Sequence, residues 1–576
     1  MQTADYIVII LYILGVVGAG MLFAGKMKSS KDMFAAGGQS PWWVSGLSGF
    51  MTIFSAGTFV VWGGIAYQYG FVAVVINMCY GVSALLVGWF LAGYWRKLGV
   101  NSASEFLQLR FGGSIVQFYT WFQGTVGIFA VGGAIYALSK IVCALIPLPE
   151  AHLLVDPETG LLSVPFTSVT LCLVVILIAF SGGLWAVLMT DVLQFVILVV
   201  SVVFVVPLIL SVAGGFTNFI DKVPEGFMSP TSSDFTWWFL AGWVIIHFFK
   251  IGGEWAFVQR YTCVPKAKDA KKAAFIFGTM YLISPVFWML PALVYRTINP
   301  GQDMEQAYIL ACNLVLPAGM MGLMVAAMAS ATASAATSQL NVFAGAFTTE
   351  VYQRIFNKEA SDKQLVAAGR VFTVILGCIV IAGSLLIPRY GYTKFIIDLT
   401  TLLTGPLVLP TIWGLFSKKI GIKAVWGTTL LGFAAAAIVK FGLTADGFLT
   451  EIAFLQPLSE WVITNMRIAD LSSGILVPFI VLVILELIEK GEHPRWQYIK
   501  DSKANFQETE ILESSTMPAK MVMVTLAIIG LMMLVLALID QEEMTTLISF
   551  SLILFLISGI LYFILRSNNK QLHTNN

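Results

Sequence analysis

Long apolar runs recur along most of this 576-residue chain and limit the folds open to it. An α-helix needs about 20 apolar residues to cross a bilayer, and it satisfies its own backbone hydrogen bonds there. The runs therefore predict an all-α integral membrane protein with about 15 transmembrane helices. The predicted spans lie near residues 5–25, 43–66, 70–94, 115–145, 165–182, 185–212, 237–258, 271–295, 317–347, 366–387, 394–416, 421–443, 471–489, 519–538 and 544–565.

The composition agrees with a membrane protein, because 58% of the residues are hydrophobic and only 11% are charged. The net charge of +1 gives no reason to expect a nucleic-acid partner. The six cysteines are scattered without a CxxC motif, so neither a disulfide framework nor a zinc site is expected. The first run, Tyr6 to Phe23, lacks the basic start and cleavage site of a signal peptide. We expect a multi-pass protein of the cell membrane, in contact with the lipid bilayer.

Basic residues are concentrated in alternate loops, which predicts the orientation. Loops rich in Lys and Arg lie near residues 26–31, 96–110, 260–272, 418–423 and 566–570, and the intervening loops are acidic or mixed. Short basic loops remain on the cytoplasmic side. We therefore expect the N-terminus outside and the C-terminus inside. The longest soluble stretches, about 444–468 and 490–518, are too short for an extramembrane enzyme domain.

Two predicted helices carry interruptions at matching positions. The second span contains FMTIFSAGTF (Phe50 to Phe59), and the seventh contains HFFKIGGEWAFVQR (His247 to Arg260). Counted from the second span, these are the first and sixth helices of a ten-helix unit. Interrupted helices in corresponding positions of two inverted halves indicate the midplane site of a transporter. The alternative is that small residues simply allow close helix packing.

Polar side chains within the apolar spans are the candidate site residues. In the ninth span Ser334, Thr337, Ser338 and Asn341 follow spacings of three and four residues, which places them on one helix face. Hydroxyl oxygens are ligands that alkali cations accept, although small polar residues also serve helix packing. Asp191 is a carboxylate inside the sixth span, where a charge is costly and usually functional. Its alternative role is to stabilise the nearby helix N-terminus.

An ordered series of motifs resembles the sodium/solute symporter family from Asp5 to about Gly432. The motifs are SSKDMFAAGGQSPWWVSGLS (29–48), RKLGVNSASEFLQLRFG (96–112), GGLWAVLMTDVLQ (182–194), VQRYTCVPKAKDAKKA (258–273), the segment 316–354, and GLFSKKIGIKAVWG (414–427). The resemblance implies two inverted five-helix repeats with accessory helices at both ends. The expected parts are 1–40 (extra helix and cytoplasmic loop), 41–235 and 236–419 (the repeats), and 420–576 (four accessory helices).

The resemblance also implies two sodium sites. In the first, sodium would be held by the carbonyls of Met51, Phe54 and Ala331 and by the hydroxyl of Ser334. The family usually has a second hydroxyl where this chain has Ala335, and the loss of one ligand should weaken the site. In some relatives another sodium ion uses an aspartate and a hydroxyl pair, which correspond here to Asp191, Thr337 and Ser338.

The implied substrate contacts are Thr58, Asn77, Gln123 and Glu254. Sugar-transporting relatives have an amide where Thr58 stands and Asn or Asp where Glu254 stands, and they use a lysine that the segment 280–294 lacks. Lys250 is four residues from Glu254 and is able to pair with it. If Lys250 faces the cavity instead, an anionic substrate gains; if Glu254 does, a cation or polyol gains. The sequence leaves these alternatives open.

Other classes of membrane protein fit poorly. The chain has no GxxxxGK[ST] nucleotide motif, no repeated filter segment, and no cluster of histidines with nucleophiles. We predict a sodium-coupled symporter, not an enzyme, that imports a small polar solute, with a sugar or sugar derivative favoured. The alternative is sodium- or proton-coupled transport of a carboxylate or an amino acid such as proline. We expect sodium as the coupling ion, no cofactor, and a monomer.

Overall fold

The computed structural model describes residues 1–24, 38–181, 184–445, 447–506, 508, 517–539 and 543–574. Within these ranges the ordered elements are helices, apart from two isolated β-bridges between residues 147 and 162. The predicted cytoplasmic loop at 26–31 falls outside the described residues, as do the first two glycines of the GGLWAVLMTDVLQ motif. The all-α prediction is confirmed for the described part of the chain.

Among the described residues, 11 helices are long and apolar enough to cross a membrane, or up to 12 if one bent pair counts as a span. Shorter apolar helices at Thr3–Tyr12, Val164–Leu177 and Trp237–Gly253 coincide with the first, fifth and seventh predicted spans. The apolar runs therefore form helices as predicted. The longer elements are α1 (Thr3–Ala24), α3 (Trp42–Ile53), α5 (Val72–Phe90), α8 (Gly113–Cys143), α9 (Val164–Ser181), α10 (Leu184–Val212), α12 (Trp237–Gly253), α14 (Ala267–Ile298), α16 (Met320–Ala346), α17 (Asp362–Leu386), α18 (Tyr392–Leu403), α20 (Ile422–Ala437), α22 (Met466–Ile488), α24 (Met517–Ile539) and α25 (Met544–Thr574).

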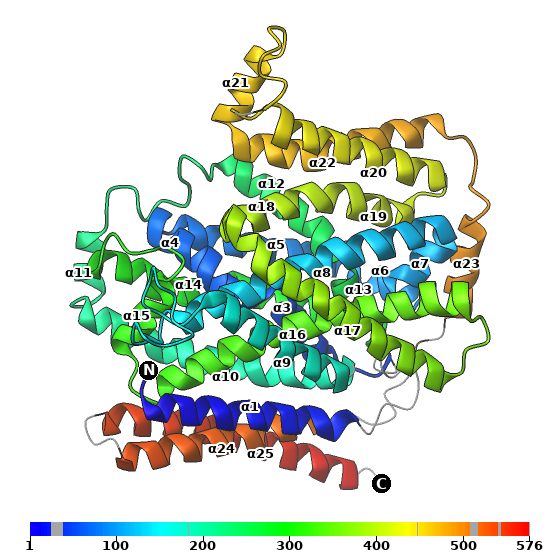
Figure 1. Ribbon diagram of the computed structural model, residues 1–576. Coiled ribbons are helices and arrows are strands. Elements are labelled where there is room, and N and C mark those ends of the chain that lie inside the picture. The colour runs from blue at the N-terminus through cyan, green and yellow to red at the C-terminus, as the bar shows by residue number, and fades with distance from the viewer. Residues whose placement is uncertain are drawn as a thin grey trace.

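Shorter helices continue or connect these elements. They are η2 (Thr58–Trp62), α4 (Gly63–Tyr69), α6 (Ala92–Lys97), α7 (Ala103–Arg110), α11 (Phe216–Lys222), α13 (Trp255–Thr262), α15 (Ala307–Val315), η3 (Phe347–Phe356), η4 (Ile387–Tyr390), η5 (Thr404–Val408), α19 (Leu409–Phe416), η6 (Ile438–Gly442), α21 (Gln456–Thr464) and α23 (Trp496–Asn505). Most of the long helices run side by side along one direction, as a membrane bundle requires (Figure 1).

The bundle is built around α16. In its most apolar window 83% of the residues are buried, compared with 28% in the span that begins at Met544. Helices α1, α24 and α25 lie together along one side, and α20 and α22 lie on the opposite side (Figure 1). The polar stripe predicted on the ninth span is therefore inside the protein, because α16 packs against α1, α3, α8 and α10.

The first helix fixes the beginning of α16. Asp5 is 2% exposed, and its Oδ1 accepts hydrogen bonds from the backbone N–H groups of Gly319 at 2.7 Å and Gly322 at 2.8 Å. A carboxylate is favoured at a helix N-terminus because the N–H groups there lack partners within the helix. A Cβ at Gly322 would lie 2.5 Å from the Asp5 Cα, so this close approach requires glycine.

Both predicted helix interruptions are confirmed. α3 ends at Ile53, because Phe54 adopts φ −80° and ψ 123°, and the two parts of the span are bent by 58°. After the break, the Ala56 N–H donates to the Thr332 hydroxyl of α16 at 2.8 Å. Likewise α12 ends before Glu254, whose ψ of 138° separates it from α13. Close packing contributes as well, since a Cβ at Gly253 would lie 2.6 Å from the Val408 side chain.

Candidate functional site

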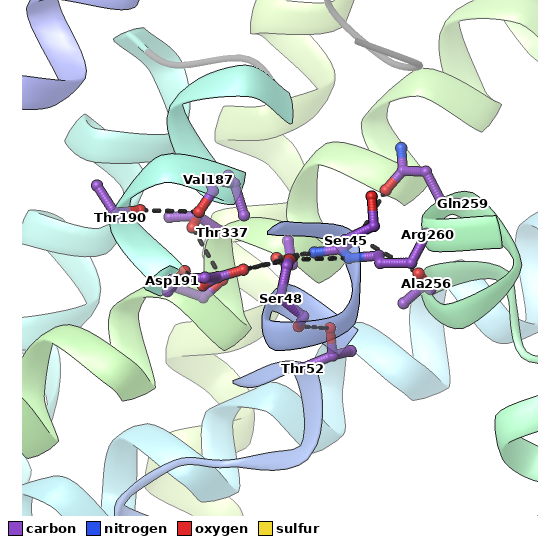
Figure 2. Close-up of polar contacts among 12 residues, drawn as sticks. Ser45, Ser48, Thr52, Val187, Thr190, Asp191, Ala256, Gln259, Arg260 and Thr337 are labelled. Carbon is purple, nitrogen blue, oxygen red and sulfur yellow. Dashed lines mark hydrogen bonds and ion pairs between the residues drawn. The ribbon is translucent and has the colours of Figure 1, made fainter. Parts of the chain in front are cut away.

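Asp191 lies at the centre of a buried polar cluster that joins four helices. It is on α10 and is 1% exposed. The Ser48 hydroxyl of α3 donates to its Oδ2 at 2.5 Å, and the Ser334 hydroxyl of α16 donates to its Oδ1. Figure 2 shows Ser48 between Asp191 and the Arg260 side chain of α13. A guanidinium nitrogen of Arg260 lies 4.0 Å from the Asp191 carboxylate.

Arg260 is a site residue that the sequence interpretation missed. It is 1% exposed, and it donates to the hydroxyls of Ser48 at 3.2 Å and Ser338 at 2.8 Å. It also donates to the side-chain oxygen of Gln259 at 2.8 Å. The available signal was a basic residue directly after an interrupted helix, but its position at the end of the span suggested a cytoplasmic loop residue.

The ion pair explains how Asp191 is tolerated inside the bundle. A buried carboxylate is costly unless it is paired and hydrogen-bonded, and here Arg260 and two hydroxyls provide both. The pair is formally neutral. A sodium ion that reached Asp191 would therefore share the carboxylate with Arg260 and would have to replace a hydroxyl hydrogen bond.

The residues predicted for the first sodium site lie on the two expected elements. Met51 and Phe54 are at the end of α3, each 1% exposed, and Ala331 is fully buried on α16. The extended ψ of Phe54 turns its carbonyl out of the helical hydrogen-bond pattern. The Ser334 hydroxyl, in contrast, is directed to Asp191. Ser334 thus connects the predicted first set of ligands to the predicted second set.

The other predicted partners of Asp191 have different contacts. The Thr337 hydroxyl donates to the Ser334 backbone carbonyl at 3.0 Å, and the Ser338 hydroxyl accepts from Arg260. Both residues are buried beside the cluster. Hydrogen bonds to Asp191 come instead from Ser48 and Ser334. The expected residues are therefore gathered in one place, but the Ser334 and Ser338 hydroxyls bond the Asp191–Arg260 pair, and the Thr337 hydroxyl bonds a backbone carbonyl.

A cavity of about 270 Å³ lies next to the cluster and between the two helix breaks. Ala335, adjacent to Ser334, lines it. The predicted solute contacts Thr58, Gln123 and Glu254 line it too. The Glu254 carboxylate accepts a hydrogen bond from the Gln339 amide of α16 at 3.2 Å. The wall combines polar groups with the rings of Trp62, Tyr80, Trp243, Phe257, Phe343 and Tyr392.

Asn77 lies outside the cavity wall, whereas Lys250 and Glu254 belong to it. Asn77 is not among the lining residues; it is 1% exposed, and its amide donates to the Ala73 carbonyl one turn earlier at 2.9 Å. The structure thus places Asn77 behind the wall of this cavity, and its contact with a solute stays a prediction. Lys250 and Glu254, which the sequence leaves as alternatives, both line the cavity.

Comparison with known proteins places this architecture among transporters. A family model described as "SSF: Sodium:solute symporter family" matches residues 33–432. The sodium/sialic acid symporter NanT of Aliivibrio fischeri is 26% identical over 455 residues, which cover 75% of this chain and 86% of that protein. The sodium/glucose cotransporter of Vibrio parahaemolyticus is 24% identical over 496 residues, with coverages of 78% and 87%.

A solved structure shares the fold. It is the substrate-bound outward-open state of a Na+-coupled sialic acid symporter, with a TM-score of 0.66 and 21% identity. The match covers 83% of this chain and 98% of that chain.

Proposed function

Because the chain belongs to the sodium:solute symporter family, it is a sodium-coupled membrane transporter and not an enzyme, and we propose that it imports a sugar or a sugar derivative by alternating access. The observation that carries the proposal is the cavity between the two helix breaks, whose wall reaches Ala335 beside the Asp191 cluster. Solute and ion would thus bind on neighbouring residues of one helix.

The cavity offers the groups that recognise a hydroxylated ring. Thr58 presents a hydroxyl, Gln123 an amide and Glu254 a carboxylate, each able to bind solute hydroxyls. The rings of Trp62 and Tyr80 offer apolar faces against which a sugar ring packs. Relatives named for sialic acid and for glucose support this class of solute. Amino acids and monocarboxylates are the alternative class.

For sodium we propose two overlapping sites that meet at Ser334. Carbonyl and hydroxyl oxygens suit an alkali cation, and these groups are found where α3 is interrupted and along α16. The proposed ligands of the first site are Met51, Phe54, Ala331 and Ser334, and those of the second are Asp191, Thr337 and Ser338. Since Ala335 supplies no hydroxyl to the first site, the carboxylate of the second would contribute more of the affinity.

Coupling follows from hydrogen bonds that sodium would rearrange. Ser48 and Ser334 tie α3 and α16 to Asp191, and Ala56 ties the chain after the break to Thr332. A sodium ion at Ser334 would hold α3 against α16 and so keep Thr58 in the cavity wall. Sodium can shift the conformational equilibrium only by its differential affinity for the two states. We propose that it binds the outward-open state more tightly.

The finer architecture is also proposed. We expect about 15 spans, with the N-terminus outside and the C-terminus inside. Residues 41–235 and 236–419 would be the inverted repeats, and segments 1–40 and 420–576 the accessory parts. The two confirmed helix breaks fall one in each proposed repeat, which supports this division. We further propose that a monomer in the lipid bilayer is the transporting unit.

A ligand screen on the purified transporter tests the class of solute. Thermal unfolding would be followed with sugars, acidic sugars, amino acids and monocarboxylates, in sodium and in choline chloride. A ligand that binds the folded state raises the apparent melting temperature. We expect sugars or acidic sugars to stabilise the protein, and more strongly in sodium. Stabilisation by amino acids or monocarboxylates alone would overturn the proposal.

A further inference from the structure

Lys250 is a cation in the cavity wall with no counter-ion among the residues that the structure describes. It is partly buried in the last turn of α12 and lines the cavity. Within the part of the chain that the structure describes, its ammonium group forms no ion pair within 4.0 Å. Glu254 follows four residues later, the spacing at which helical side chains usually pair.

The helix break explains why Lys250 and Glu254 do not neutralise each other. Glu254 has left the helix, with ψ at 138°, and its carboxylate is directed to the Gln339 amide at 3.2 Å. The carboxylate of Glu254 thus has a partner on α16, whereas Lys250 has no ion-pair partner in the described part of the chain. The cavity contains one hydrogen-bonded anion and one separate cation.

Three other cations inside the bundle are neutralised by carboxylates of the protein. Lys140 lies 2.5 Å from Glu305, Arg260 lies 4.0 Å from Asp191, and Lys440 lies within 3.1 Å of two aspartates. A charge within a membrane span is costly and usually pairs with another group or faces a water-filled pathway. Lys250 differs from these three because it lines the solute cavity and forms no ion pair with a described residue.

We propose that Lys250 binds a carboxylate on the solute, so that the transported molecule is an acidic sugar and not a neutral hexose. This inference rests on the proposed function and narrows its solute class. A carboxylate supplies the missing counter-ion through a charge-assisted hydrogen bond, which is about twice as strong as a neutral one. The hydroxyl-bearing part of the solute would contact Thr58, Gln123 and Glu254.

Matched acid and ester pairs test this proposal. Glucuronate and N-acetylneuraminate would each be compared with the methyl ester of the same sugar, in sodium, by thermal shift on the full-length purified protein. The ester keeps the ring and loses the charge. We expect at least one acid to bind about tenfold or more tightly than its ester. Lys250→Gln should abolish this preference and Lys250→Arg should retain most of it. Lys222→Gln, an exposed lysine on α11, is the matched control for charge loss.

Two results would overturn the proposal: an acid and its ester that bind equally, or a Lys250→Gln variant that keeps the preference for the acid. The ester comparison needs only the wild-type protein, so it remains decisive if Lys250→Gln does not fold. Sodium-dependent binding of glucose without a preference for acids would refute the role of Lys250 and leave the proposed function intact. No sodium-dependent binding of any sugar would refute both.

Discussion

Removing Arg260 should make the stability of the protein depend on sodium binding at Asp191. In Arg260→Met the Asp191 carboxylate stays buried but loses a guanidinium at 4.0 Å. Two unit charges at this distance attract each other by about 4 kcal/mol at an effective dielectric constant of about 20. Breaking a buried ion pair on one side costs about 3–5 kcal/mol because the remaining charge is uncompensated. Sodium is the cation proposed to bind at this carboxylate. We therefore expect a variant that is destabilised in choline and stabilised again by sodium.

The effect of sodium on the stability of this variant is measured by thermal unfolding. Tryptophan fluorescence would be followed in sodium chloride and in choline chloride of equal ionic strength. The melting temperature of Arg260→Met should fall by several degrees in choline, and sodium should restore most of the loss. Recovery of about 2.7 kcal/mol requires sodium at about 100 times its Kd. The double variant Asp191→Asn/Arg260→Met has no carboxylate and should lose this extra response to sodium.

Two results would refute the reasoning. If Arg260→Met melts like the wild type in choline, the ion pair does not stabilise the fold. If sodium raises the melting temperature of Arg260→Met no more than that of the double variant, Asp191 is not a sodium ligand.

Three further changes have defined outcomes. Ala335→Ser adds a hydroxyl beside the proposed sodium ligands and should raise sodium affinity up to about tenfold, or about 1.4 kcal/mol; unchanged sodium activation of uptake would contradict this. Lys440→Met removes the cation that pairs with Asp470, whose side chain is 3% exposed, and should lower the free energy of unfolding by about 3 kcal/mol. Lys440→Arg keeps the charge and should leave the stability nearly unchanged; equal melting temperatures for the two variants would contradict the pairing. Burial and two nearby arginines lower the pKa of His493, so the unfolded chain takes up a proton first and stability should fall as pH drops below about 6.5. His493→Gln should reduce this pH dependence of the melting temperature. A variant whose melting temperature changes with pH as steeply as that of the wild type would contradict the role of His493.

The helices and both interruptions could be predicted because they depend on local sequence. Apolar length identifies a span, and the small and polar residues around Phe54 and Glu254 weaken the helix where it breaks. The buried face of α16 followed from the spacing of Ser334, Thr337 and Ser338. Each of these signals lies within one turn or one span of the chain.

The contacts within the site could not be predicted, because they depend on how distant helices pack. Arg260 reaches Ser48 and Ser338, which belong to two other helices, and nothing near Arg260 in the sequence indicates this. Asn77 was expected at the cavity from its place in the family pattern, yet its amide is satisfied by its own helix. Spacing alone allows Lys250 to pair with Glu254, but the helix break at Glu254 directs that carboxylate to Gln339 instead.

Uptake into proteoliposomes tests the central claim, which is sodium-coupled solute import through the Asp191 cluster. Purified protein would be given a labelled sugar that stabilises it, under an inward gradient of sodium or of choline at the same pH. We predict accumulation above the equilibrium level in sodium only, and loss of the sodium dependence in Asp191→Asn. Equal accumulation in choline would contradict the account.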